Sequence, residues 1–348
     1  MVPVVDLSRR GQRVASEFGV AAQRIAANGI FLLGAETAAF EREFAHWIGM
    51  PDAVAVSSGA AALQLALVGL GVGPGDEVIL PAFTAVPTAS AVCAVGAVPV
   101  LVDVERATGL LDLGLIESAR TDRTKAVIVV HLYGRPAELP HTDLLVIEDA
   151  AQAHGALVAP RSSDAVAYSF YPTKNLGGIG DGGVVAIDNE MLGAYLRRLR
   201  VHGMTEMYAH AHVSQNFRMS EVEAAWLRLL LSSLHDDNNR RRDIAGRYRE
   251  AAPHLAWQQS HPDHVFHQCV FRSLRRDDVR TDLAAAGVAT GVHYPFAVTQ
   301  QVAYKQFART ACPQAEAWAA ECISVPCFPE LTDVEVDQVA SELAKVAP

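Results

Sequence analysis

One lysine in the sequence lies where a lysine is unusual, in a tight turn between an apolar segment and a glycine-rich loop. Lys174 follows the apolar run 165–170 and Pro172. After it come the glycine-rich residues 177–183 and a second apolar run, 184–187. Such apolar runs are typical of buried strands, so the lysine is expected where two strands converge. An ammonium group against apolar walls loses hydration, which favours the neutral amine and makes it a nucleophile toward a carbonyl. The obvious carbonyl is that of an aldehyde cofactor.

A carboxylate stands at the end of another apolar run. Residues 144–147 are uninterruptedly apolar, and Glu148 and Asp149 follow them directly. In open α/β sheets ligands bind at the carboxyl ends of the strands, so Asp149 is expected to point into a crevice. A carboxylate and a lysine on neighbouring strands suit pyridoxal phosphate, whose pyridine nitrogen needs an anionic partner and whose aldehyde forms a Schiff base with lysine. Taken alone, Asp149 could equally cap a helix after its strand.

A phosphate cradle is predicted where a short strand, 53–56, turns into a helix. Ser58 and Gly59 form a small-residue turn at the start of that helix. A helix N-terminus exposes unpaired backbone N–H groups beside the positive end of the helix dipole, and such groups bind phosphate. The alternative is that Ser58 is a plain N-cap.

The elements that must position these residues alternate between strand and helix. The apolar runs 96–104 and 126–134 are predicted strands with helical material between them, which indicates a doubly wound α/β fold. Residues 178–183 fit the dinucleotide spacing G-x-G-x-x-G, but a strand follows where a helix should stand, so no dinucleotide site is predicted. The N-terminal 48 residues are predicted to be helical, with an aromatic stripe of Phe40, Phe44 and Trp47 facing the core.

A charged helix that begins near residue 236 is expected to lead into a second domain. There we predict a strand at 265–271 and helices at 276–288 and 333–346. The expected organisation is an N-terminal segment with a large cofactor-binding domain, 1–235, and a small α+β domain, 236–348.

Taken together, these motifs resemble those of the DegT/DnrJ/EryC1/StrS sugar aminotransferases, a family of fold-type-I pyridoxal phosphate enzymes. The resemblance covers nearly the whole chain, in ordered segments at 56–63, 98–104, 131–134, 147–155, 169–183, 216–220 and 293–295. It implies a fold-type-I architecture in which a mostly parallel sheet of the large domain lies between helices.

The resemblance also implies roles for individual residues. Lys174 and Asp149 would be catalytic, and His293 and Tyr294 would contact the substrate. The implied cofactor-binding residues are Ser58, Gly59, Ala60, Ala85, Asp149, Gln152, Ser169, Lys174 and Asn216. Gln152 would lie near the cofactor ring and its phenolic oxygen, and Ser169 would bind the phosphate.

Three positions depart from the family pattern. Ala60 replaces a threonine whose hydroxyl contacts the phosphate, and Ala85 replaces an aromatic residue that stacks on the ring. Phe83 is a possible substitute for that aromatic. A second histidine that usually follows His293 is absent, since residues 296–300 read Phe-Ala-Val-Thr-Gln.

The function that the resemblance implies is transamination from an amino acid, L-glutamate, to a keto sugar that is typically nucleotide-linked, in amino-sugar biosynthesis of secondary metabolism. A keto-cyclitol or an aminohydroxybenzoate precursor is an alternative acceptor. A deoxygenating relative of the family carries histidine at the position of Lys174, so the lysine argues against deoxygenation. A non-catalytic, cofactor-binding regulator is a more distant alternative, which the presence of both Lys174 and Asp149 disfavours.

The resemblance further implies a homodimer with shared active sites, in which Asn216 reaches the partner's cofactor phosphate. A two-fold interface would make that contact reciprocal. The alternative is that Asn216 caps the helix that follows it.

Composition excludes several other classes of protein. The 348 residues carry a formal net charge of −10, which disfavours nucleic acid as a partner. Five cysteines without CxxC spacing suggest neither a disulfide framework nor a zinc ribbon. The histidines at 210 and 212, and at 261, 264 and 267, lack a ligand-like context, so no metal site is predicted. No secretory signal or run of about 18 uncharged apolar residues occurs, and a cytoplasmic location without membrane contact is expected.

Overall fold

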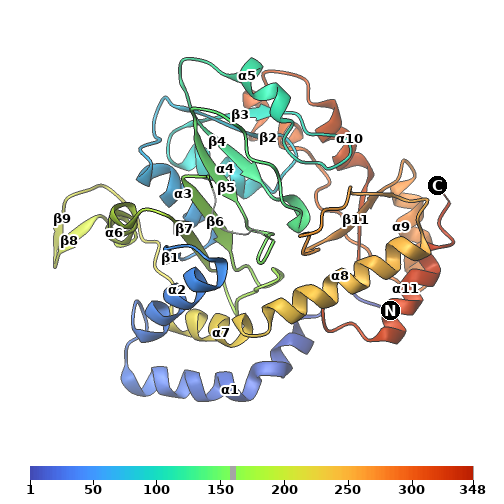
Figure 1. Cartoon of the computed structure of the whole chain (residues 1–348), viewed down its shortest axis with the longest axis horizontal. Helices are drawn as coiled ribbons and strands as arrows, with labels where there is room; N and C mark the ends of the chain where they lie inside the picture. Colours follow the sequence, from blue (N-terminus) through green and yellow to red (C-terminus); the bar gives the residue numbers. More distant parts are fainter. Residues whose placement is uncertain (157–161, 348) are drawn as a thin grey trace.

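A seven-stranded sheet forms the centre of the computed structural model, which describes residues 1–156 and 162–347. Its strands lie in the order β1-β7-β6-β5-β4-β2-β3 (Figure 1). They are β1 (Asp52–Val56), β2 (Glu77–Pro81), β3 (Val98–Val102), β4 (Thr124–Val130), β5 (Leu145–Asp149), β6 (Ala165–Ser169) and β7 (Gly183–Ile187). All neighbours pair in parallel except β7, which is antiparallel to both β1 and β6. The predicted mostly parallel sheet is confirmed.

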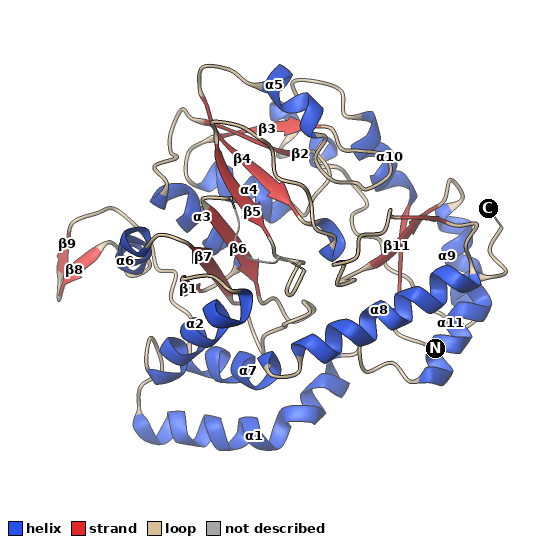
Figure 2. Ribbon diagram, in the orientation of Figure 1, coloured by secondary structure: helices blue, strands red, loops and turns tan. Residues whose placement is uncertain are grey.

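Helices cover both faces of this sheet (Figure 2). The helices are α1 (Leu7–Asn28), α2 (Ala35–Ile48), α3 (Gly59–Gly69), α4 (Val86–Ala94), α5 (Ile116–Ala119), α6 (Glu190–Leu199), α7 (Glu221–Leu231), α8 (Leu234–Ala251), α9 (Arg276–Ala285), α10 (Pro313–Glu321) and α11 (Asp333–Leu343). Alternate residues of each central strand point to opposite faces, as the period of two requires. One face packs against α3, α4, α6 and α10, and the other against α2 and α7.

The predicted aromatic stripe of α2 lies in the second of these cores. Phe40 and Phe44 are fully buried, and the Phe44 ring makes edge contacts with Tyr168 and Phe170 at centroid distances of 5.1 and 5.4 Å. Because Tyr168 and Phe170 flank the end of β6, this packing holds the strand that leads into the lysine turn.

A second, three-stranded sheet belongs to the C-terminal part of the chain. Its strands are β10 (Ala256–Trp257), β11 (Cys269–Arg272) and β12 (Cys322–Val325), in that order and antiparallel. A separate apolar cluster unites it with α8, α9 and α11. Val2 joins the same cluster and forms a bridge with Val288, so the N-terminus of the chain packs there. The division into domains at residue 235 stays a prediction.

The strand predicted at 265–271 begins four residues later than expected. The backbone N–H groups of Val265 and Gln268 donate to the carbonyls of Gly134 and Tyr133, in the loop after β4. Phe266 adopts a positive φ of 43°. Residues 265–268 are therefore held by the large sheet's loop instead of a neighbouring strand, which the apolar pattern did not reveal.

A small hairpin of β8 (Met204–Glu206) and β9 (Ala209–His210) projects away from the rest of the chain (Figure 1). No helix of the described residues is long and apolar enough to cross a membrane.

Candidate active site

Lys174 lies in the turn that leaves β6, as the sequence predicted. Its backbone N–H donates to the carbonyl of Tyr171 at 2.8 Å, and the residue is only 9% exposed. Burial lowers the pKa of Lys174 to about 8, and the negative charge of Asp149 opposes that shift. The neutral, nucleophilic fraction of the amine near neutral pH is therefore much larger than for an ordinary lysine.

The glycine-rich loop after Lys174 allows other groups to approach its backbone closely. A Cβ at Gly177 would collide with the carbonyl of Pro172 and with Arg10, and one at Gly183 would collide with the carbonyl of Ser58. The indole N–H of Trp226 donates to the carbonyl of Gly177 at 3.0 Å. Glycine is thus required here for steric reasons, because backbone and side-chain atoms occupy the space of a Cβ.

Asp149 ends β5, next to β6, and is buried. Its Oδ2 accepts a hydrogen bond from the Thr88 hydroxyl at 2.8 Å, and its Oδ1 accepts from the N–H of Ala151 at 3.1 Å. The Thr88 hydroxyl also lies 3.2 Å from that of Thr84. The carboxylate is therefore oriented from α4 as well as from its own strand. The described residues after β5 form turns, so Asp149 does not cap a helix.

A hydrogen-bonded chain links Gln152 to the predicted substrate residues. The Gln152 side-chain oxygen accepts from the N–H of Tyr133 at 2.7 Å, and its amide nitrogen donates to the hydroxyl of Tyr294 at 3.2 Å. The hydroxyl of Tyr133 donates to the carbonyl of His293, whose ring Nδ1 lies 2.9 Å from the hydroxyl of Ser324. The sequence analysis did not identify Tyr133 as a member of this hydrogen-bonded chain. Its backbone has a positive φ of 63°.

His293 and His267 lie close to the lysine. Burial and the Lys174 charge lower the pKa of His293 to about 4, and the same two causes lower the pKa of His267 well below its usual value. Both rings line a cavity with Thr173, the residue before the lysine. Each imidazole is therefore neutral at neutral pH and can exchange hydrogen bonds without competing as a charge with Lys174.

The residues predicted to bind phosphate lie at the start of α3 and the end of β6, which are in contact. Ser58 is the N-cap of α3, and its hydroxyl accepts from the N–H of Ala61 at 3.1 Å. A Cβ added to Gly59 would lie 2.5 Å from the Cβ of Ser169, so the helix start and Ser169 touch. The first turn still presents N–H groups without helical partners, at Gly59 and Ala60. Capping and phosphate binding are compatible, since the Ser58 hydroxyl keeps its own proton to donate.

The two positions considered for ring stacking differ in their surroundings. Ala85 is partly exposed and forms the N-cap of α4. Phe83 is fully buried, and its ring stacks against Trp318 at a centroid distance of 5.9 Å, with Tyr294 at its edge. The ring of Phe83 is thus engaged in the core under the site, which disfavours it as a substitute.

Asn216 does not cap the helix that follows it. Ser220 is the N-cap of α7, and its hydroxyl accepts from the N–H of Glu223 at 3.2 Å. Asn216 is exposed, and its side-chain oxygen accepts from Nε of Arg218 at 2.9 Å. The local alternative for Asn216 was therefore wrong.

Two other buried histidines, His131 and His264, have structural environments. Nε2 of His131 lies 2.8 Å from Glu148, and its Nδ1 accepts from the N–H of Ala137 at 2.9 Å. The ring of His264 stacks on Phe266 and lies 3.0 Å from Gln258. Within residues 1–156 and 162–347, no three His, Cys, Asp or Glu side chains form a group that could hold a metal.

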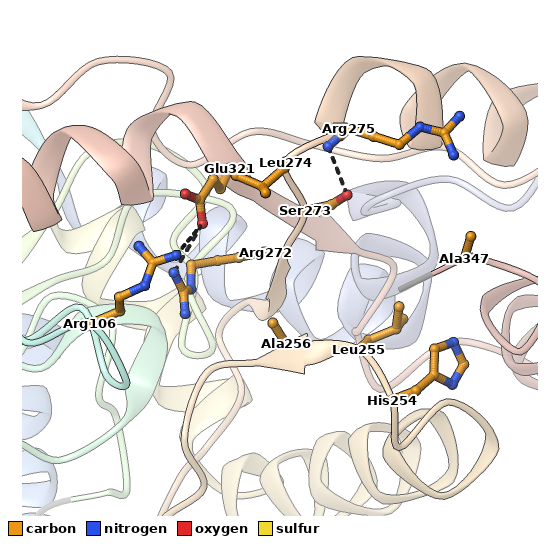
Figure 3. Close-up of a pocket in the computed structure, with 10 residues that line it drawn as sticks. All are labelled: Arg106, His254, Leu255, Ala256, Arg272, Ser273, Leu274, Arg275, Glu321 and Ala347. Carbon is orange, nitrogen blue, oxygen red and sulfur yellow. Dashed lines mark hydrogen bonds and ion pairs between the residues drawn. The ribbon is translucent and has the colours of Figure 1, made fainter.

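Another pocket lies in the C-terminal part of the chain and is separate from the lysine (Figure 3). Arg106 and Arg272 both reach Glu321, at 3.4 and 3.0 Å, so one carboxylate is shared between two guanidinium groups. None of the predicted site residues lines this pocket. The candidate active site is therefore the buried region around Lys174 and Asp149.

Comparison with known proteins agrees with this geometry. The sequence profile of the DegT/DnrJ/EryC1/StrS aminotransferase family matches residues 12–344. The chain is 39% identical to a UDP-N-acetyl-3-dehydro-alpha-D-glucosamine 3-aminotransferase of Acidithiobacillus ferrooxidans, over 99% of this chain and 97% of the relative. DesV of Streptomyces venezuelae, solved in complex with a ketimine intermediate, superposes with a TM-score of 0.93 at 38% identity, over 100% of this chain and 99% of that one. A putative sugar aminotransferase of Streptococcus pneumoniae, solved in a PLP form, is 26% identical with a TM-score of 0.84, over 94% of each chain.

Proposed function

This chain belongs to the DegT/DnrJ/EryC1/StrS aminotransferase family and is a pyridoxal phosphate-dependent transaminase, and we propose that it aminates a nucleotide-linked keto sugar. The amino donor in this proposal is L-glutamate. The observation that carries it is the buried Lys174, in the turn after β6, beside Asp149, the last residue of the neighbouring strand β5. The proposed setting is amino-sugar biosynthesis of secondary metabolism in the cytoplasm.

The residues present fit the cofactor. The absence of a Cβ at Gly59 lets Ser169 pack directly against the start of α3, so its hydroxyl lies beside the helix N-terminus, an arrangement that suits a phosphate group. Asp149 offers a carboxylate oriented by Thr88, which suits a protonated pyridine nitrogen. Pyridoxal phosphate, when bound, supplies an aldehyde that reacts with Lys174 and a ring that withdraws the negative charge developing at the donor α-carbon.

The roles of the chain's own groups follow from their surroundings. Lys174 would hold the cofactor through its aldehyde, and its free amine would then take a proton from the donor α-carbon and return it on the cofactor side. Its lowered pKa allows the amine both to accept and to return that proton near neutral pH. Gln152 and Tyr294, which are hydrogen-bonded to each other, are proposed to border the ring and the substrate. His293 is held by Ser324 beside them.

The donor half-reaction tests this function directly. We expect L-glutamate alone to convert the bound cofactor to its pyridoxamine form, and 2-oxoglutarate to reverse the conversion, because each half-reaction is complete in itself. The measurement is the absorbance of the bound cofactor. Running the reverse direction against keto sugars and keto-cyclitols identifies the acceptor. If the protein binds the cofactor but no amino acid converts that cofactor to the pyridoxamine form, the protein is the non-catalytic regulator instead.

A second expectation concerns the missing aromatic at position 85. Since Ala85 is only partly buried and Phe83 is engaged with Trp318, the cofactor face is expected to be more open here than in relatives. Ala85→Phe should tighten cofactor binding by about 1 kcal/mol, the strength of a typical aromatic pair. Equilibrium dialysis of the cofactor measures the change, with Ala85→Leu as the control for added apolar area. Weaker binding in both variants would mean that another group already fills the space.

We also propose a homodimer with shared active sites. Asn216 is exposed and has no role in capping α7. Exposed apolar side chains gather near the start of α7: Phe31 accepts a backbone hydrogen bond from Glu221, Leu32 bridges Ser220, and Ile179 lies in the loop that Glu223 holds. Such a patch, beside the lysine loop, suits burial against a second copy.

A further inference from the structure

Arg10, in the first turns of α1, contacts the backbone of the lysine turn. Its Nη1 donates one hydrogen bond to the carbonyl of Pro172 and another to the carbonyl of Lys174, each 3.0 Å long. The residue is only 4% exposed. A side chain from the start of the chain thus contacts the peptide group of the reactive residue itself.

The guanidinium of Arg10 lies in a space that the turn keeps free. A Cβ on Gly177 would collide with the Arg10 Nη1 and with the carbonyl that it binds. Burial and the charge of nearby Arg241 lower the pKa of Arg10 to about 10, so the group remains charged at neutral pH. A charged donor makes hydrogen bonds about twice as strong as a neutral one, so the two bonds to Pro172 and Lys174 stabilise the observed conformation of the turn.

The same side chain faces the C-terminal part of the chain. Nε of Arg10 lies 4.0 Å from Glu330, the residue that precedes Leu331 and α11. Glu330 also lies 3.8 Å from Arg13, and its carbonyl accepts from Arg9. Figure 1 shows the N-terminus of the chain beside α11. α1 therefore connects the lysine turn with the segment that carries Glu330.

We propose that Arg10 is a positioning residue for transamination, which fixes the peptide group of Lys174 so that the amine is correctly aligned with the cofactor and donor. The role rests on the proposed function of Lys174. Arg10 contacts no reacting atom, and its effect passes through two carbonyl groups. Without it, the turn is free to shift, and a displacement of about 1 Å can cost roughly 100-fold in rate.

The kinetic test uses Arg10→Met, Arg10→Lys and the control Arg13→Met. We expect Arg10→Met to lower kcat about 10- to 100-fold, with KM for glutamate within about twofold, because alignment and not binding is lost. Arg10→Lys should recover part of kcat, since an ammonium can still donate to a carbonyl. Arg13 is on the same helix and also faces Glu330 but does not contact the turn, so its variant should stay within about twofold of the wild type.

A second readout does not depend on turnover. The rate at which the apoprotein captures pyridoxal phosphate, followed by absorbance, should rise with pH through about 8 in the wild type, as Lys174 loses its proton. In Arg10→Met the midpoint should move upward, because a loosened turn lets water reach the amine. Arg13→Met should keep the wild-type midpoint.

The outcomes separate positioning from simple stabilisation. Arg10→Met with a lower melting temperature but unchanged kcat and pH midpoint would overturn the proposal. If Arg10→Met does not fold, Arg10→Gln decides, because its shorter side chain carries no charged donor: wild-type kcat and midpoint in that variant would likewise overturn the proposal. Wild-type apoprotein that captures no pyridoxal phosphate would instead refute the proposed function, whatever the Arg10 variants do.

Discussion

Replacing Lys174 by alanine will abolish transamination while the chain still folds. The lysine is expected both to hold the cofactor aldehyde and to move the proton, so its loss should lower kcat by on the order of 10⁴-fold or more. Rapid-mixing absorbance of the half-reaction with glutamate measures the loss, and circular dichroism monitors the fold. Lys125→Ala, at a lysine that pairs with Asp76 away from the site, is the control. A Lys174→Ala protein that still converted the cofactor would remove Lys174 from the mechanism.

The lowered pKa of Lys174 also predicts an effect on the stability of the folded chain. Lys174 titrates at about 8 in the folded chain, below its ordinary 10.5, so folding disfavours the protonated amine. That cost, on the order of 3 kcal/mol, is fully present below pH 8 and disappears as pH rises toward 10.5. Lys174→Met, which fills the space without a charge, should therefore raise the free energy of unfolding of the apoprotein at pH 7. Denaturant titrations across this pH range should show the advantage shrinking, and a constant difference would contradict the assignment.

Mixing two inactive variants is expected to restore activity if the sites are shared. Under the proposed shared-site homodimer, Lys174→Ala chains and Asn216→Ala chains should each form dimers that are inactive on their own. In a heterodimer, one site then contains both lesions, and the other combines an intact Lys174 with an intact Asn216 from its partner. With equal amounts and free exchange, about a quarter of the wild-type activity should return.

A matched mixture controls for this recovery. Lys174→Ala chains mixed with Asp149→Ala chains should stay inactive, because β5 and β6 place both residues in the same chain's site. Subunit exchange is verified with differently tagged chains. If exchange occurs and the first mixture also stays inactive, Asn216 does not act across an interface.

The parts of this enzyme that local patterns specify were predictable from the sequence. Uninterrupted apolar runs mark β5 and β6, and the polar residues that end them, Asp149 and the turn of Lys174, emerge at one edge because neighbouring parallel strands do so. The N-cap of α3 at Ser58 is equally local, since its hydroxyl bonds to a backbone group three residues on. The family motifs extended these predictions to the fold and the activity.

Contacts between distant segments depended on the tertiary structure. Thr88 orients Asp149, the last residue of β5, from helix α4, and Arg10 holds the carbonyl of a lysine 164 residues away. The strand predicted at 265–271 starts late because its first residues bond to the loop after β4. Hydrophobic periodicity reports which face of an element is buried, but it does not report which buried group lies opposite. A hydrogen bond, which requires its two atoms within about 3 Å, is therefore decided only when the elements pack.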